Sequence, residues 1–369
     1  MEKFDIPISK PDLSKQDFLE IKKCFDSTWI SSKSPWVEKF EKSFAKKISG
    51  TKYSVGVNSG TSALFLALKS LGIGVGDEII LPTLTMIATI NAITWVGATP
   101  VLVDSTSQND WNIDPKKIKE KITNKTKAIL PVHLYGYPCD MDEINKIAKE
   151  HKLYVIGDVA EAMGTLYKNK SVGNCNDISC YSLYSNKIIT TGNGGMVCTN
   201  DQNIYHLIKK LSFFDFNETT HFKHNLIGYN LVLSGLQAAL GYSQAKRFKK
   251  YINKRIQVFS WYKENFKNEQ VKLIISAKEN SPNYWFPAVL FKDKNTKKRI
   301  VDYLSKNRVE TRDFFLPIHL QPVYKNFFKK QKYPISEYFF ERGLLLPSYF
   351  KITKNQVKFI CNLILKKIK

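Results

Sequence analysis

Short apolar runs alternate with amphipathic stretches over the first two thirds of the chain. Residues 61–71 carry apolar side chains at helical spacing, and residues 141–151 do the same between two apolar runs. Alternation of this kind predicts a parallel sheet with helices on both faces. The expected strands are residues 53–57, 78–81, 100–103, 128–133, 153–156, 178–184 and 195–199.

The pattern changes after residue 240. Residues 246–266 predict one long amphipathic helix, and residues 296–306 and 354–367 predict two more. The aromatic residues 283–291 predict a strand. We therefore expect a large α/β domain over residues 1–245 and a smaller α+β domain over residues 246–369, on which residues 1–30 could also pack.

Residues 79–103 are uncharged and long enough to suggest a membrane span. Prolines, a glycine and several threonines interrupt this run, which favours a strand, a loop, a buried helix and a second strand. We expect no membrane insertion. The chain has six cysteines without a C-x-x-C pair and no early segment like a signal peptide, which predicts reduced thiols in the cytoplasm.

The net charge of the 369-residue chain is +23, which raises the question of a nucleic-acid partner. The lysines are scattered through helix-like segments such as residues 114–127 and 246–254. No basic stripe interleaved with aromatic residues and no zinc-finger spacing accompanies them. The charge therefore favours solvated faces over nucleic-acid binding, and it is compatible with an anionic small substrate. We expect no metal site.

Lys187 differs from the other lysines in its surroundings. It lies between an apolar run and the glycine-rich residues 190–195, with Ser182 nearby. Desolvation there would lower the pKa of the amine and make it nucleophilic. Asp158 ends another apolar run, where a carboxylate would point into a ligand crevice or simply cap a helix. An amine for a Schiff base and an acid for a pyridine nitrogen are what pyridoxal phosphate (PLP) needs.

The segment Asn-Ser-Gly-Thr-Ser-Ala-Leu at residues 58–64 lies between a predicted strand and helix. Backbone N–H groups and the helix dipole favour a phosphate there, although the same residues also make an ordinary helix start. Glu161 could bond a cofactor oxygen or act in a capping box. His133 and His319 each follow an apolar segment and could be core histidines or face the cleft.

Together these motifs resemble the DegT/DnrJ/EryC1/StrS family of sugar aminotransferases, which are fold-type I PLP enzymes, over nearly the full chain. The motifs are residues 59–64, 82–89, 123–129, 131–136, 158–162, 182–196 and 228–230. The resemblance implies a large, mostly parallel, seven-stranded α/β/α domain and a smaller α+β C-terminal domain.

The resemblance also implies a role for each matching residue. Lys187 would bond the cofactor covalently and move the substrate proton, while Asp158 would hold the pyridine nitrogen and Glu161 the phenolic oxygen. The remaining cofactor contacts would come from Gly60, Thr61 and Ser182 at the phosphate, Met86 on the ring, and Asn230 from the other subunit of a homodimer with shared active sites. Substrate contacts would come from Trp29, Ser31, His133, Tyr135, Asn193 and His319.

Three positions depart from the pattern of the family. Met86 replaces an aromatic residue, Asn193 an acid and Val232 an arginine. Lys187 favours transamination, because related dehydratases carry histidine there. The implied reaction transfers the amino group of L-glutamate to a nucleotide-linked 4-keto-6-deoxyhexose for a surface polysaccharide. The alternatives are a smaller phosphorylated ketone, such as dihydroxyacetone phosphate converted to serinol phosphate, and a regulatory protein without turnover.

Overall fold

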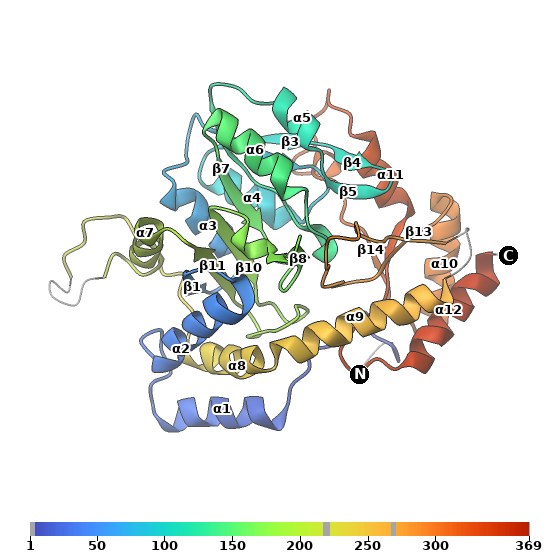
Figure 1. Ribbon diagram of the computed structural model, residues 1–369, viewed down its shortest axis with the longest axis horizontal. Coiled ribbons are helices and arrows are strands. Elements are labelled where there is room, and N and C mark those ends of the chain that lie inside the picture. Colours follow the sequence, from blue (N-terminus) through green and yellow to red (C-terminus); the bar gives the residue numbers. More distant parts are fainter. Residues whose placement is uncertain (1–3, 217–221, 267–270, 369) are drawn as a thin grey trace.

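The computed structural model describes residues 4–216, 222–266 and 271–368. Its larger part is built on a seven-stranded sheet and its smaller part on a four-stranded sheet (Figure 1). In the larger sheet only β11 runs antiparallel to its neighbours, so the sheet is mostly parallel as predicted. From edge to edge its strands are β1 (Tyr53–Val57), β11 (Gly195–Thr199), β10 (Ile178–Ser182), β7 (Tyr154–Asp158), β6 (Thr126–Ile129), β2 (Glu78–Pro82) and β3 (Thr99–Val103).

Helices cover both faces of this sheet because its buried strands are apolar on both sides. In β2, Ile79 packs in the same apolar cluster as the helices α3 (Gly60–Ser70) and α4 (Ile87–Trp95). The next residue, Ile80, packs on the opposite face with α6 (Met141–His151). Side chains that alternate between two cores are what a doubly covered strand requires.

The remaining elements of the larger part lie around this core. Two short hairpins lie outside the main sheet, β4 (Ser105–Ser107) with β5 (Asp110–Ile113) and β8 (Leu166–Tyr167) with β9 (Lys170–Ser171). The other helical elements are α1 (Lys15–Asp26), α2 (Pro35–Phe44), the π-helix η1 (Ala45–Ser49), α5 (Pro115–Glu120), α7 (Gln202–Ser212), α8 (Gly235–Lys246) and the 3-10 turns η2 (Leu134–Gly136) and η3 (Val172–Asn174).

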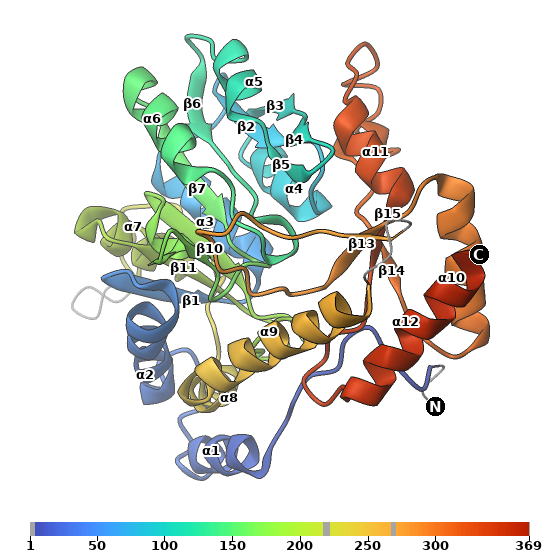
Figure 2. The ribbon, with the colours of Figure 1, turned by 45° about the vertical axis from the view of Figure 1, so that its right-hand side comes forward.

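The smaller part has an antiparallel sheet with helices packed on its outer side (Figure 2). Its strand order is β12 (Lys272–Leu273), β13 (Ala288–Leu290), β15 (Gly343–Leu345) and β14 (Arg312–Asp313). A second apolar core joins this sheet to three long helices. The helical elements of this part are α9 (Phe248–Asn265), α10 (Lys294–Lys306), η4 (Ile318–Leu320), α11 (Pro334–Arg342) and α12 (Lys354–Ile368).

Helix α9 contributes to both apolar cores, with Tyr251 in the first and Val258 and Tyr262 in the second. The prediction of one long helix over residues 246–266 is confirmed to within two residues at each end, because α8 ends at Lys246 and α9 runs over Phe248–Asn265. The intervening Arg247 adopts φ −106° and ψ 9°, and its guanidinium pairs with Asp17 of α1 at 2.6 Å. Arg247 thus separates α8 from α9 and links this junction to α1.

Two other predicted strands are shorter in the structure. Residues 128–133 form a strand only to Ile129, and residues 283–291 only at Ala288–Leu290. In the second segment the amide Nδ2 of Asn283 donates to the carbonyls of Glu161 and Met163, at 2.8 and 3.0 Å, and Tyr284 has φ +47°. These residues therefore join the small part to the large sheet instead of extending β13.

The N-terminal residues contact both parts of the molecule. Ile6 forms a bridge with Val309, and the backbone N–H of Ile8 donates to Glu310 at 2.8 Å. Helix α1, in contrast, packs on α8. The uncharged residues 79–103 form β2, a loop, α4 and β3 as expected. Within the described ranges, no helix is long and apolar enough to cross a membrane.

Candidate active site

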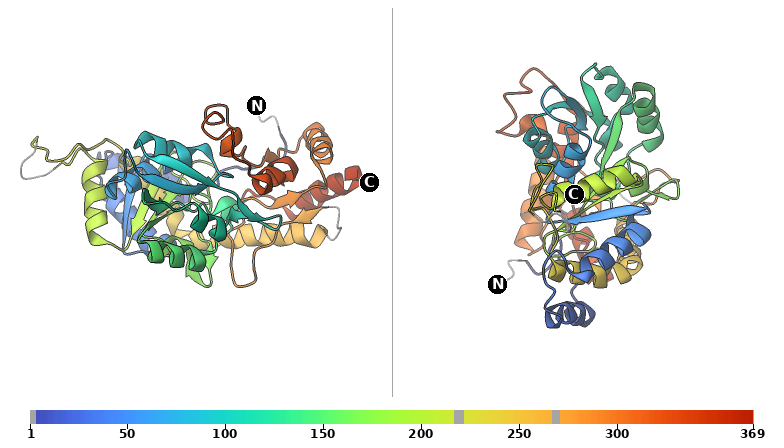
Figure 3. Two further views of the ribbon diagram at one scale, coloured as in Figure 1. Left: turned by 90° about the horizontal axis from the view of Figure 1, so that it is seen from above. Right: turned by 90° about the vertical axis from the view of Figure 1, so that its left-hand side faces the viewer.

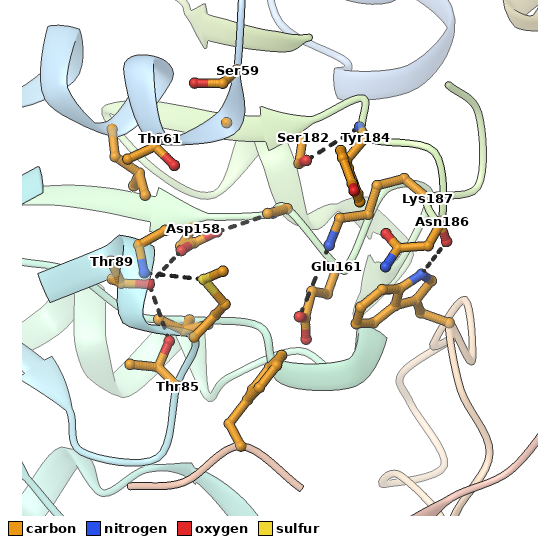
Figure 4. Close-up of a pocket in the computed structure, with 18 of the residues that line it drawn as sticks. Ser59, Thr61, Thr85, Thr89, Asp158, Glu161, Ser182, Tyr184, Asn186 and Lys187 are labelled. Atoms are coloured by element: carbon orange, nitrogen blue, oxygen red, sulfur yellow. Dashed lines mark hydrogen bonds and ion pairs between the residues drawn. The ribbon is translucent and has the colours of Figure 1, made fainter. Parts of the chain in front are cut away.

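A cavity of about 340 Å³ lies at the carboxyl ends of β7 and β10 and at the beginning of α3 (Figure 4). The larger sheet and its loops supply most of its wall, and the smaller part supplies the rest. Its polar lining includes Ser59, Thr61, Thr85, Thr89, Asp158, Glu161, Ser182, Tyr184, Asn186, Lys187, Asn193 and Arg312, and its aromatic lining includes Trp285 and Phe315.

Lys187 occupies the turn that follows β10, and its side chain is only 11% exposed. Its ammonium lies 3.9 Å from Glu161 Oε1 and 3.9 Å from the centre of the Trp285 ring. Burial lowers the pKa of Lys187, and the negative charges of Glu161 and Asp158 offset this only in part. The fold therefore keeps an amine that loses its proton more easily than a surface lysine, as a nucleophilic lysine must.

The backbone of the Lys187 turn is held on both sides. The backbone N–H of Lys187 donates to the Tyr184 carbonyl at 3.0 Å, and Trp285 Nε1 donates to the Asn186 carbonyl at 2.8 Å. Further along, Thr190 Oγ1 donates to the Leu183 carbonyl at 2.9 Å. A tight turn with side-chain bonds across it fixes the direction in which the amine points (Figure 4).

Asp158 is the last residue of β7 and is buried. One carboxylate oxygen accepts from Thr89 Oγ1 at 2.8 Å, and the other accepts from the backbone N–H of Ala160 at 3.1 Å. Thr85 Oγ1 lies 3.1 Å from Thr89 Oγ1 and extends this chain of hydroxyls. Burial raises the pKa of Asp158, while the two hydrogen bonds and the charge of Lys187 act in the opposite direction.

Glu161 is also buried, and its Oε1 lies 3.9 Å from the amine. Its Oε2 accepts from the backbone N–H of Tyr135 at 2.8 Å. Burial raises the pKa of Glu161, and the charge of Lys187 opposes this shift. The charges of the two acids and of Lys187 therefore act on one another within the cavity.

The beginning of α3 forms the opposite end of the cavity from Glu161. Ser59 caps the helix by accepting from the Ser62 N–H at 3.0 Å, which leaves the first turn of backbone facing Ser182. A Cβ atom on Gly60 would lie 2.9 Å from Ser182 Cβ, so only glycine allows this approach. A helix start that opens with glycine beside a serine hydroxyl is suited to an anion such as phosphate.

These features together fit PLP. The buried amine, the buried carboxylate and the phosphate-binding helix start surround one cavity, and Asn186 Oδ1 is a buried oxygen without a partner among the described residues. Lys187 would hold the cofactor covalently, Asp158 its ring nitrogen, and the α3 end its phosphate. When bound, PLP supplies the electron-withdrawing ring that makes a C–H bond beside an amine acidic. The fold and site define the class of fold-type I PLP enzymes.

Comparison with known proteins assigns the family. The model of the DegT/DnrJ/EryC1/StrS aminotransferase family matches residues 11–365, so the chain belongs to this family. GDP-perosamine synthase of Escherichia coli O157:H7 is 42% identical over 96% of both chains. GDP-perosamine synthase of Vibrio cholerae is 34% identical over 97% of this chain and 98% of its own.

Solved structures agree with this assignment. A Streptococcus pneumoniae protein in its PLP form matches 99% of both chains with a TM-score of 0.94 and 25% identity. PseC of Helicobacter pylori, an aminotransferase of pseudoaminic acid biosynthesis, matches 98% of this chain and 99% of its own with a TM-score of 0.93 and 27% identity. The protein is a PLP-dependent aminotransferase of fold type I, as the resemblance implied.

The cavity brings together most of the residues predicted to contact the cofactor. They are Gly60, Thr61, Met86, Asp158, Glu161, Ser182 and Lys187, and the predicted substrate residue Asn193 lines it as well. Met86 is 46% exposed and caps α4, with its sulfur accepting from the Ala88 N–H at 3.0 Å. Asn230 lies outside the cavity of its own chain, on an exposed segment.

Five predicted substrate residues do not line the cavity. The two histidines among them are buried, as core histidines would be. His133 is fully buried and its Nδ1 accepts from the Cys139 N–H at 3.1 Å, while burial lowers the pKa of the ring to about 3. His319 lies between Thr83 Oγ1 at 2.7 Å and Glu337 Oε1 at 3.1 Å. Tyr135 is buried, and Trp29 and Ser31 are exposed elsewhere on the surface.

The cavity also contains residues that were not predicted as site residues. Thr85 and Thr89 belong to the quoted motif at residues 82–89, so their polarity in an apolar run was an available signal. Trp285, Arg312 and Phe315 come from the smaller part. They reach the site through the packing of the two parts.

Proposed function

We propose that this aminotransferase moves the amino group of L-glutamate to GDP-4-keto-6-deoxymannose, as a step in the synthesis of a surface polysaccharide. The observation that carries the proposal is the 42% identity to a GDP-perosamine synthase over 96% of both chains. Two further relatives with the same name, from Vibrio cholerae and Caulobacter vibrioides, share 34% and 36% identity over nearly their whole length.

The chain supplies what each half of such an exchange needs. Lys187 is a buried amine that can take a proton from one carbon and return it to another. Glu161 lies 3.9 Å from this amine, where its negative charge stabilises the protonated form. Asp158 would keep a ring nitrogen protonated, and its position in the cavity lining at the end of β7 supports this role. Trp285 and Phe315 add an apolar wall to the cavity, in which the side chain of Lys187 is only 11% exposed.

The test is to convert the purified enzyme to its pyridoxamine phosphate form, add GDP-4-keto-6-deoxymannose, and follow the absorption of the resting cofactor as it returns. We expect rapid return with this sugar. No return, together with rapid return for dihydroxyacetone phosphate in a parallel reaction, would contradict the proposal. It would favour the smaller phosphorylated ketone that Met86, Asn193 and Val232 motivate.

We also propose that the enzyme works as a homodimer with shared sites. The support is the segment after α7, which extends away from the body of the molecule (Figures 1 and 3). Its described residues include the large apolar side chains Phe214, Leu226 and Ile227, exposed by 47, 40 and 88%. Asn230 is exposed at the end of this segment, where it could reach the α3 end of a partner's cavity. The predicted cytoplasmic setting stays a prediction.

A further inference from the structure

Arg255 is a buried cation in helix α9. Among the residues that the structure describes, no acid forms an ion pair with it, and burial lowers the pKa of its guanidinium to about 10. A buried guanidinium destabilises a fold unless its hydrogen bonds compensate for the lost water. The groups that accept these hydrogen bonds therefore indicate what the charge does in this protein.

The guanidinium of Arg255 is directed at one backbone carbonyl. Arg255 Nη1 donates to the Trp285 carbonyl at 3.0 Å and also donates to Ser348 Oγ. Ser348 is buried, and its Oγ donates to the same Trp285 carbonyl at 2.7 Å. This carbonyl thus accepts from two donors, one of them charged, and charged donors form the stronger hydrogen bonds.

The side chain of Trp285 contacts the Lys187 turn in two ways. Its Nε1 donates to the Asn186 carbonyl at 2.8 Å, and the centre of its ring lies 3.9 Å from Lys187 Nζ. Trp285 is buried and lines the cavity, whereas Arg255 does not line it. A shift of the Trp285 backbone would therefore move a ring that touches the amine.

We propose that Arg255 is a positioning residue that holds the indole ring of Trp285 against the amine of Lys187. The inference rests on the proposed role of Lys187 as the reacting amine. The face of an indole ring attracts an ammonium at this distance, and a ring that is held in place also limits the directions in which the amine can point. Arg255 thus acts on Lys187 through Trp285, without contact with substrate or cofactor.

The test measures the pKa of Lys187 in the cofactor-free protein by competitive acetylation, read from the proteolytic peptide that contains this residue. Trp285→Leu keeps an apolar side chain but removes the ring face, so we expect the acid dissociation constant of the Lys187 ammonium to rise about fivefold. Arg255→Met should change this constant in the same direction. The double variant should match Trp285→Leu alone, because without the ring Arg255 has nothing to position.

Two further variants change the same carbonyl contact more gently. Arg255→Lys keeps a charged donor but loses the planar fork, so it should restore part of the wild-type constant. Ser348→Ala removes the neutral donor to the Trp285 carbonyl and should cause a smaller change in the same direction. These two variants carry the test if Arg255→Met does not fold.

The matched control is Arg247→Met. Arg247 pairs with Asp17 at 2.6 Å and does not line the cavity. Its loss should lower the free energy of unfolding without changing the dissociation constant of Lys187, which controls for a general loss of stability. The other charged groups that act on Lys187, which are Glu161, Asp158 and Arg312, are unchanged in all these variants.

Two results would overturn the inference. One is a folded Arg255→Met protein, or an unchanged Arg255→Lys and Ser348→Ala pair, with the wild-type constant for Lys187. The other is a double variant in which the effects of Arg255→Met and Trp285→Leu simply add. A Lys187→Ala enzyme that stays active would refute the proposed role of Lys187 only, because the coupling between Arg255 and Trp285 is measured without turnover.

Discussion

Asp158 illustrates at the scale of one residue how an acid can be kept ionisable inside a protein. Its burial opposes the charged form, and only two hydrogen bonds and the neighbouring lysine act in its favour. A pyridinium nitrogen would supply the missing opposite charge. The buried charge of Asp158 therefore lowers the stability of the folded protein unless a ligand pairs with it. This is common for binding groups in marginally stable proteins.

Thr89→Val tests how much of this arrangement depends on one hydroxyl. The change keeps the shape of the side chain but removes the donor to Asp158 Oδ2. We expect the dissociation constant of PLP, measured by equilibrium dialysis, to rise about tenfold, the usual effect of one lost bond to a charged group. Thr85→Val should cause a smaller rise, since Thr85 contacts the other hydroxyl and not the acid. Equal effects would contradict this order.

Asp158→Asn should change how the stability of the cofactor-free protein depends on pH. The pKa of Asp158 is raised in the folded protein. Its favourable contribution to the free energy of unfolding is therefore complete below the ordinary pKa of 3.8 and is lost as the pH rises through the folded pKa. Asparagine does not titrate. Cofactor-free Asp158→Asn should therefore unfold with a higher free energy than cofactor-free wild type at pH 7, and the difference should shrink toward pH 4.

The control for this pH experiment is an acid with the opposite shift. Lys168 lowers the pKa of the exposed Asp142, so Asp142→Asn should leave stability at pH 7 unchanged or slightly lower. Urea unfolding at several pH values gives both comparisons. An Asp158→Asn protein that is less stable than the wild type at pH 7 without cofactor would show that hydrogen bonding outweighs burial at this position.

At the scale of elements, the phosphate end depends on how closely α3 approaches β10. Gly60→Ala places a Cβ 2.9 Å from Ser182 Cβ and 3.2 Å from its Cα, both of which belong to a buried central strand. We expect a loss of about 1–3 kcal/mol in the free energy of unfolding and weaker PLP binding, because the helix must move away from the strand. Gly74→Ala is the matched control.

Gly74 has room for the added methyl group. Its nearest neighbour would be the Val96 carbonyl oxygen at 3.6 Å, an ordinary contact distance. Gly74→Ala should leave both the unfolding free energy and the PLP dissociation constant close to those of the wild type. Equal losses in the two variants would mean that the approach of α3 to β10 does not account for the requirement for glycine at residue 60.

The elements themselves differ in how well local sequence predicts them. Residues 141–151 form α6 over the predicted range, because Asp140 caps the helix and its apolar positions 141, 144, 147 and 148 repeat at helical spacing. The strand predicted over residues 283–291 forms only at Ala288–Leu290. Asn283 instead donates to the carbonyls of Glu161 and Met163, which are far from it in the chain.

At the scale of the whole molecule, complementation tests the proposed dimer. A Lys187→Ala chain keeps Asn230, and an Asn230→Ala chain keeps Lys187. If each site uses both residues from different chains, unfolding and refolding the two inactive variants together should restore about a quarter of wild-type activity, from one intact site in each mixed dimer. Variants refolded separately and then mixed without exchange are the control. No recovery despite proven mixed dimers would refute shared sites.

The sequence by itself determined the chemistry of this protein and the order of its elements. Lys187, Asp158 and the residues around Gly60 could be recognised because each lies at the end of an apolar run, and in a parallel sheet such ends converge on one edge. The tertiary structure alone decided what surrounds that chemistry. Trp285, Arg312 and Phe315 reach the cavity, and His133 and His319 do not, because the packing of two sheets sets which side chains face the same space. Such contacts join residues far apart in the chain, which no local pattern records.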